Sequence, residues 1–244
     1  MTAVAAAEAQ PRRRRIDAGV IRATERDVRG MAWVVEMAAM PFDLLQRVLG
    51  ASSYSVLQNV ISRWRRAGWA RTARLGPGPQ WCWATAAGIR KFGRHEYAER
   101  EPNAGRLEHL RAVAEFRMWI EDRRRDDDPE WVSERELRWE QGTRRGSDAA
   151  RLRLPDGVVQ WTASNGARVS AAVEVELSPK PFDLVRDNMA SGLAQHRQVV
   201  WVVTPRTRSL VLRARDEQGE AAARVQLVEL DTVRRDLYGE EARC

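Results

Sequence analysis

The chain has 244 residues, enough for one large domain or two smaller ones, each with its own core. Two cysteines and the lack of an apolar run near the ~20 residues of a membrane span argue against a disulfide framework, a cysteine-rich zinc site or a membrane helix. The formal net charge of +7 is concentrated in residues 1–100, which hold 17 Lys and Arg against 8 Asp and Glu. A basic first part favours a nucleic-acid partner, and we expect a cytoplasmic protein with no membrane contact.

The first part of the chain begins with a predicted tail and continues with helices. Residues 1–21 lack apolar periodicity and are predicted to be a disordered basic tail. Thr24 and Asp27 have the spacing of a capping box, which predicts a helix over residues 24–40. A second, short helix is predicted over residues 41–50, because it begins with proline and ends with glycine.

A third helix is predicted from Ser53 to about Ala67. Its apolar residues recur at helical spacing, and they are Val56, Leu57, Val60, Ile61 and Trp64. Two strand-like runs follow around the Gly-Pro turn at residues 76–79, and the first of them carries arginines. Helix, helix, helix and basic hairpin is the order of a winged helix-turn-helix, which we expect over residues 22–100.

The polar face of the third helix is the predicted DNA contact. Gln, Asn, Ser and Arg side chains can hydrogen-bond to base edges in a major groove, and hairpin arginines can lie over phosphates. The predicted DNA-binding residues are Ser53, Tyr54, Ser55, Gln58, Asn59, Ser62, Arg63, Arg66, Arg71 and Arg74. The alternatives are a merely solvated helix face and a surface for protein contacts.

The second part of the chain alternates predicted helices and strands. A linker-like stretch near residues 100–106 precedes it, so we expect a second domain over residues 106–244. The predicted helices cover residues 107–124, 182–196 and 232–238, and the predicted strands cover residues 131–140, 157–161, 171–177, 198–204 and 210–214. This pattern predicts an α/β (α+β) fold.

Two of these strands carry acids in a pattern that suggests a metal site. Asp156 immediately precedes one strand, and Glu174 and Glu176 alternate with apolar residues in the next. Because a strand has period two, both glutamates point to the same face. Carboxylates repeated on one face of an apolar strand are costly unless they meet water, a cation or a partner. They are therefore either a divalent-metal site or a solvated strand face paired with arginines such as Arg186.

If the site is active, Asp156 and Glu174 are the predicted ligands of Mg²⁺ or Mn²⁺. Lys180 follows in a Ser-Pro-Lys-Pro turn and is expected to fold back toward these acids. The predicted catalytic set is then Asp156, Glu174, Glu176 and Lys180. His95, His109 and His196 are scattered along the sequence and are expected to be structural or exposed.

These motifs together resemble the actinobacterial plasmid replication-relaxation family. That family pairs an N-terminal winged helix with a C-terminal domain akin to the PD-(D/E)xK nucleases. The segments that carry the resemblance are Ser53–Thr85, His109–Trp119, Trp131–Glu134, Leu154–Gly157, Val173–Leu177 with Lys180, and Val199–Thr204. The usual nuclease core has a lysine two residues after the second acid, where this chain has Glu176. The resemblance therefore implies nuclease-like acids at Asp156 and Glu174 in a domain that has lost catalysis.

The expected function is DNA binding for a plasmid or other mobile element, in its replication, transfer or control. Double-stranded DNA is the expected partner, with a second copy of the chain and replication or transfer proteins as further candidates. A metal-dependent endonuclease or nickase that uses Asp156 and Glu174 is the alternative. A protein-interaction adaptor is a second alternative, and it predicts neither DNA binding nor cleavage.

Overall fold

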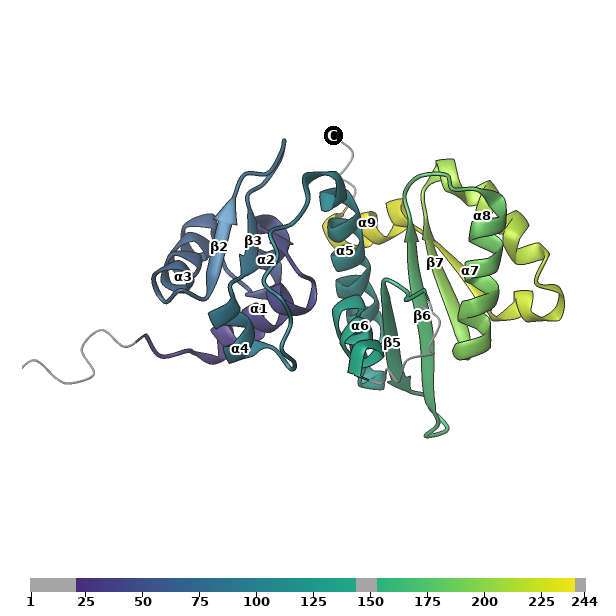
Figure 1. Ribbon diagram of the computed structural model, residues 1–244, viewed down its shortest axis with the longest axis horizontal. Coiled ribbons are helices and arrows are strands. Elements are labelled where there is room, and N and C mark those ends of the chain that lie inside the picture. The colour runs from purple at the N-terminus through teal and green to yellow at the C-terminus, as the bar shows by residue number, and fades with distance from the viewer. Residues whose placement is uncertain (1–20, 144–152, 240–244) are drawn as a thin grey trace, which may run out of the picture.

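The computed structural model describes residues 21–143 and 153–239, so nearly all of the predicted basic tail lies outside the described residues. Within them the protein is a mixed α+β structure with a small sheet in the first part and a larger one in the second (Figure 1). Among the helices described, none combines the length and the apolar character needed to cross a bilayer.

The first part follows the predicted order of helices and hairpin. Its elements are α1 (Glu25–Glu36), β1 (Met40–Pro41), α2 (Phe42–Val48), α3 (Tyr54–Arg66), β2 (Ala70–Ala73), β3 (Trp81–Ala84) and α4 (Ala86–Phe92). The sheet has the antiparallel order β1-β3-β2. Thr24 and Asp27 form the predicted capping box at the start of α1, and Ser53 caps α3 as predicted. The short helix α4 was not predicted.

The apolar stripe of α3 fixes the orientation of that helix. Leu57, Val60, Ile61 and Trp64 are buried, and they pack in the same core as α1 and α2. Because this stripe occupies one side of the helix, polar residues of α3 such as Asn59 and Ser62 lie on the opposite side, away from the core. The burial of the stripe therefore decides which side chains of α3 can meet a partner.

The second part is built around a five-stranded mixed sheet. Its elements are α5 (Leu107–Arg123), β4 (Glu130–Ser133), α6 (Glu134–Thr143), β5 (Gly157–Thr162), β6 (Arg168–Glu176), α7 (Phe182–Gln195), β7 (Gln198–Val203), α8 (Pro205–Asp216), β8 (Val225–Glu229) and α9 (Leu230–Tyr238). The strand order is β4-β5-β6-β7-β8. Pairing is antiparallel from β4 to β6 and parallel from β6 to β8.

Helices cover both faces of this sheet. Figure 1 shows α5 and α9 on the side toward the first part and α7 and α8 on the far side. Val173 and Val175 of β6 join the core on the α5 side, whereas Trp201 of β7 joins the core beneath α7 and α8. Glu174 is directly opposite Trp201 in the pairing of β6 and β7. The predicted division of β6 into an apolar face and an acidic face is therefore confirmed.

The predicted strand over residues 131–140 is confirmed for residues 131–133 and wrong for the rest. The strand β4 ends at Ser133, and the chain continues as the helix α6. The hydroxyl of Ser133 accepts a hydrogen bond from the backbone N–H of Glu136 at 3.2 Å, as the capping residue of a helix does. A serine followed three residues later by a glutamate is the sequence signature of a helix start, and the flanking tryptophans obscured it.

The predicted strand over residues 210–214 is also wrong, because these residues lie within α8. This helix begins with Pro205 at its first position and a capping interaction between Thr204 and Thr207. The true last strand is β8, which pairs parallel with β7 after a short 3₁₀ turn. Two parallel strands must be joined by a crossover connection, because the chain has to return to the same end of the sheet. The helix α8 is the main part of that connection between β7 and β8.

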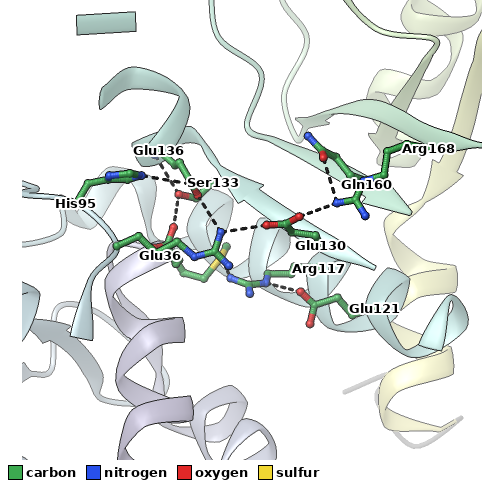
Figure 2. Close-up of polar contacts among 11 residues, drawn as sticks. Glu36, His95, Arg117, Glu121, Glu130, Ser133, Glu136, Gln160 and Arg168 are labelled. Carbon is green, nitrogen blue, oxygen red and sulfur yellow. Dashed lines mark hydrogen bonds and ion pairs between the residues drawn. The ribbon is translucent and has the colours of Figure 1, made fainter. Parts of the chain in front are cut away.

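A polar network joins the first part to the second (Figure 2). The buried hydroxyl of Ser133 donates to the carboxylate of Glu36 on α1 at 2.7 Å. His95 contacts Glu136 on α6 at 3.3 Å, and its ring stacks on that of Trp139 with 3.8 Å between centroids. The two parts therefore meet through buried, hydrogen-bonded groups as well as apolar packing.

Candidate nucleic-acid interface and acidic site

Four polar residues form a straight row along the exposed side of α3. They are Ser55, Asn59, Ser62 and Arg66, and all four are exposed. Their spacing of four, three and four residues keeps them on one line of a helix with 3.6 residues per turn. At 1.5 Å per residue the row is about 16 Å long. Gln58, which is half-buried, lies beside it.

The chain segment that carries this row contains cationic residues and no acidic ones, although acids from outside the segment pair with Arg63, Arg71 and Arg94. From Leu44 to His95 the sequence has no Asp or Glu, while it has nine Lys and Arg. Such a stretch cannot neutralise its own charge, so it attracts anions from outside it. The structure describes every residue from Leu44 to His95, so the count of nine cations and no acids covers the complete segment.

A groove beside the row is lined by arginines. It has a volume of about 550 Å³ between the end of α3 and β2, and Ser62, Arg65, Arg66, Arg71 and Thr72 are among its lining residues. Arg65 and Arg66 are exposed and form no ion pair within the described residues. Arg71 remains 64% exposed although its Nε lies 3.2 Å from a carboxylate oxygen of Glu99. Three guanidinium groups therefore converge on an open concave surface.

Most of the other predicted DNA-binding residues are also accessible. Tyr54 is 53% exposed at the first turn of α3, and Arg74 is exposed in the hairpin. Ser53 is half-buried, and its hydroxyl already accepts the backbone N–H of Val56 at 3.3 Å. Its role is therefore that of a helix cap. Arg65, which the sequence reasoning missed, flanks the row on the side of the groove.

Arg63 has a structural partner that the sequence did not reveal. Its guanidinium bonds to the carboxylate of Asp27 on α1, which is fully buried. The indole N–H of Trp64 donates to the same carboxylate oxygen at 2.6 Å. Burial alone would raise the pKa of Asp27, but the hydrogen bonds from Thr24, Arg63 and Trp64 outweigh it and lower the pKa. Arg63 therefore anchors α3 to α1.

The acids of the second part gather where β5 begins and β6 ends. The backbone N–H of Asp156 donates to the carbonyl of Val173 at 3.0 Å. One carboxylate oxygen of Asp156 accepts the backbone N–H of Val175 at 2.8 Å, and the other lies 2.9 Å from Nε2 of His109 on α5. Gly157 follows, where a Cβ would lie only 2.1 Å from the ring of Trp131. Asp156 is thus held in place by β6 and α5 together.

Glu174 and Glu176 lie in a largely buried environment. Burial, followed by the negative charge of Asp156, raises the pKa of Glu174 to about 8. Arg153 opposes this from 3.8 Å. Burial also raises the pKa of Glu176, which is 2% exposed, while Lys180 counteracts the shift. The Nζ of Lys180 lies 2.8 Å from Glu176, so the turn after β6 does fold back.

In this arrangement the protein itself engages the predicted ligands of a divalent cation. Both oxygens of Asp156 have hydrogen-bond partners, and burial beside Asp156 disfavours the charged form of Glu174. Within residues 21–143 and 153–239 no group of three or more His, Cys, Asp or Glu is placed to hold a metal ion. Asp156, Glu174 and Glu176 form an acidic cluster in which Asp156 hydrogen-bonds to Val175 of β6 and to His109 of α5.

One expectation about this cluster needs correction. Arg186 does not pair with Glu174 or Glu176, since its contacts are with Asp183, Asp187 and the more distant Glu217. These partners lie on α7 and after α8, on the surface.

His109 was expected to be structural or exposed, and its side chain has a structural role because it holds Asp156. The sequence contains no signal for this contact, because the two residues are 47 positions apart.

Searches against protein-family models, curated proteins and solved structures find no match to this chain. We therefore infer the function from the surface of α3 and the hairpin, and from the chemistry of the acidic cluster.

Proposed function

We propose that the protein binds double-stranded DNA through the exposed side of α3 and the β2–β3 hairpin. The observation that carries this proposal is the row from Ser55 to Arg66 within a segment that has nine cationic residues and no acidic ones. Nucleic-acid phosphates supply the negative charge that such a segment lacks.

The row has the chemistry and the length of a helix that reads a major groove. Hydroxyl, amide and guanidinium groups can bond to base edges, and a groove ~12 Å wide admits an α-helix. A row of about 16 Å presents such groups over several base pairs. Arg65, Arg66 and Arg71 would contact phosphates beside the major groove of the DNA. Such contacts fix the position of the protein on the duplex but do not distinguish one base sequence from another.

The second part is proposed to be a nuclease-like domain without catalysis. Its elements include α5, three antiparallel strands, α7 and a parallel strand in this order, which supports the resemblance. The position of Asp156 next to Glu174 supports it as well. The engagement of both oxygens of Asp156 by Val175 and His109 supports the loss of catalysis, as does Glu176 at the place of the usual lysine. The resemblance further suggests that the DNA belongs to a plasmid or another mobile element, in replication, transfer or their control.

Fluorescence anisotropy with a labelled mixed-sequence duplex tests the proposal. We expect saturable binding that weakens at least tenfold in a variant with Arg65→Ala and Arg66→Ala. The matched control is Arg197→Ala with Arg206→Ala, which removes two exposed arginines with no ion pair among the described residues, after α7 and at the start of α8. Absence of binding, or equal loss in both double variants, would favour the protein-interaction adaptor.

A further inference from the structure

A large cavity lies where the hairpin meets the helices of the second part. It has a volume of about 850 Å³, within the range of small-molecule sites in proteins. Leu75, Pro77 and Pro79 of the hairpin turn form one wall together with Trp81, and Leu107 of α5 completes it. This wall is apolar, and it suits a ligand with a hydrophobic body.

The facing wall is a polar network built on a fully buried carboxylate. Glu115 of α5 accepts bonds from Nε of Arg111 and Nε of Arg234, each at 2.8 Å, and from the hydroxyl of Tyr238 at 2.9 Å. Arg111 also makes two bonds to Asp43 on α2, at 2.6 and 3.2 Å. The carboxylates of Asp43 and Glu115 are therefore both paired with arginine.

Arg234 is the group in this wall with unused donors. Only its Nε has a hydrogen-bond partner within the described residues, and its side chain is 31% exposed where it lines the cavity. A guanidinium has five N–H donors in a planar fork, so the terminal nitrogens of Arg234 can still bind an acidic group.

We propose that this cavity binds a small amphipathic organic anion. The apolar body of the ligand would lie against Leu75, Pro79 and Leu107, and its acidic group would bond to the terminal nitrogens of Arg234. Two of the three carboxylates that line the cavity, Asp43 and Glu115, are paired with arginine, and the third, Glu108, is exposed to solvent, so the terminal nitrogens of Arg234 remain the group that selects an anion. This inference does not rest on DNA binding.

The test uses two fluorescent probes that share one skeleton. Anilinonaphthalene sulfonate carries an acidic group, and N-phenylnaphthylamine lacks it. We expect the full-length protein to bind one equivalent of the sulfonate at least fivefold more tightly than the neutral probe. Arg234→Gln should abolish that preference, and Leu75→Glu should weaken binding of the sulfonate at least tenfold.

The control is Leu184→Glu, which changes an exposed leucine of α7 on the far side of the sheet and should leave probe binding unchanged. Should Arg234→Gln fail to fold, Leu75→Glu decides the question, because Leu75 lies in a turn and is only half-buried. Non-saturable probe binding, equal affinity for both probes, or wild-type affinity in Leu75→Glu would each overturn the proposal.

Discussion

The guanidinium of Arg63 on α3 bonds directly to the buried carboxylate of Asp27 on α1. This contact fixes the rotation of α3 about its own axis. The row of Ser55, Asn59 and Arg66 consequently faces outward. The same carboxylate also caps the start of α1 and accepts the indole N–H of Trp64. One buried acid thus connects the helix start, the core and the proposed DNA-binding surface.

Replacement of Asp27 by Asn should destabilise the protein. The variant loses the charge that pairs with Arg63 and one of the acceptors for Thr24, so we expect the free energy of unfolding to fall by roughly 3 kcal/mol. Urea denaturation measures the change. Glu25→Gln, at an exposed position in the same helical turn, is the control and should cost well under 1 kcal/mol. Equal stability of the two variants would contradict the anchoring role of Asp27.

The raised pKa of Glu174 predicts that stability depends on pH. Its pKa is about 8 in the folded protein, against an ordinary value of 4.5, so between these values the folded state holds a proton that the unfolded state releases. The resulting stabilisation is complete below pH 4.5 and is lost as pH rises through 8. Glu174→Gln mimics the protonated acid and should lack this loss.

The difference in unfolding free energy between Glu174→Gln and wild type should therefore grow by roughly 2–4 kcal/mol from pH 5 to pH 8. Chemical denaturation at several pH values measures it, with Glu101→Gln as an exposed control. A difference that stays constant over this range would show that Glu174 is not protonated in the folded protein.

The junction between the two parts should be sensitive to Ser133. Its hydroxyl donates to Glu36 and accepts the backbone N–H of Glu136 in the first turn of α6, as Figure 2 shows. Ser133→Ala removes both bonds and leaves the Glu36 carboxylate without this donor, so we expect a loss of about 2 kcal/mol in the free energy of unfolding. Ser209→Ala, at an exposed position of α8, should change stability by less than about 0.5 kcal/mol.

The acidic cluster should not hydrolyse DNA. Both oxygens of Asp156 are engaged, and burial beside Asp156 raises the pKa of Glu174 and so disfavours the charged form that would bind a cation. We expect supercoiled plasmid to stay intact during incubation with the protein and either Mg²⁺ or Mn²⁺, as judged by gel electrophoresis. Nicking that disappears in Asp156→Ala would show that a cation displaces these partners, and it would establish the endonuclease alternative.

Local patterns predicted several elements, because each depends on residues close together in the chain. The capping pair Thr24 and Asp27, the stripe of α3 and the alternation from Val173 to Glu176 all appear in the structure as expected. The mixed α+β class followed from these patterns.

The failures involve contacts or context over longer distances. The bonds of Arg63 to Asp27 and of His109 to Asp156 join residues 36 and 47 positions apart, so no local pattern encodes them. Residues 131–140 combine a strand with a helix, and apolar spacing alone cannot place the boundary at Ser133. The strand β8 was missed because only its first residue is buried, so its apolar signal is weak.

The salt dependence of DNA affinity tests the central claim most directly. Each phosphate contact contributes a slope of about −0.9 when the logarithm of the binding constant is plotted against that of salt concentration. Loss of Arg65 and Arg66 together should make the wild-type slope shallower by about 2 units, whereas Arg197→Ala with Arg206→Ala should leave it unchanged. An unaltered slope in the Arg65 and Arg66 double variant would contradict the assignment of α3 and the hairpin as the DNA-binding surface.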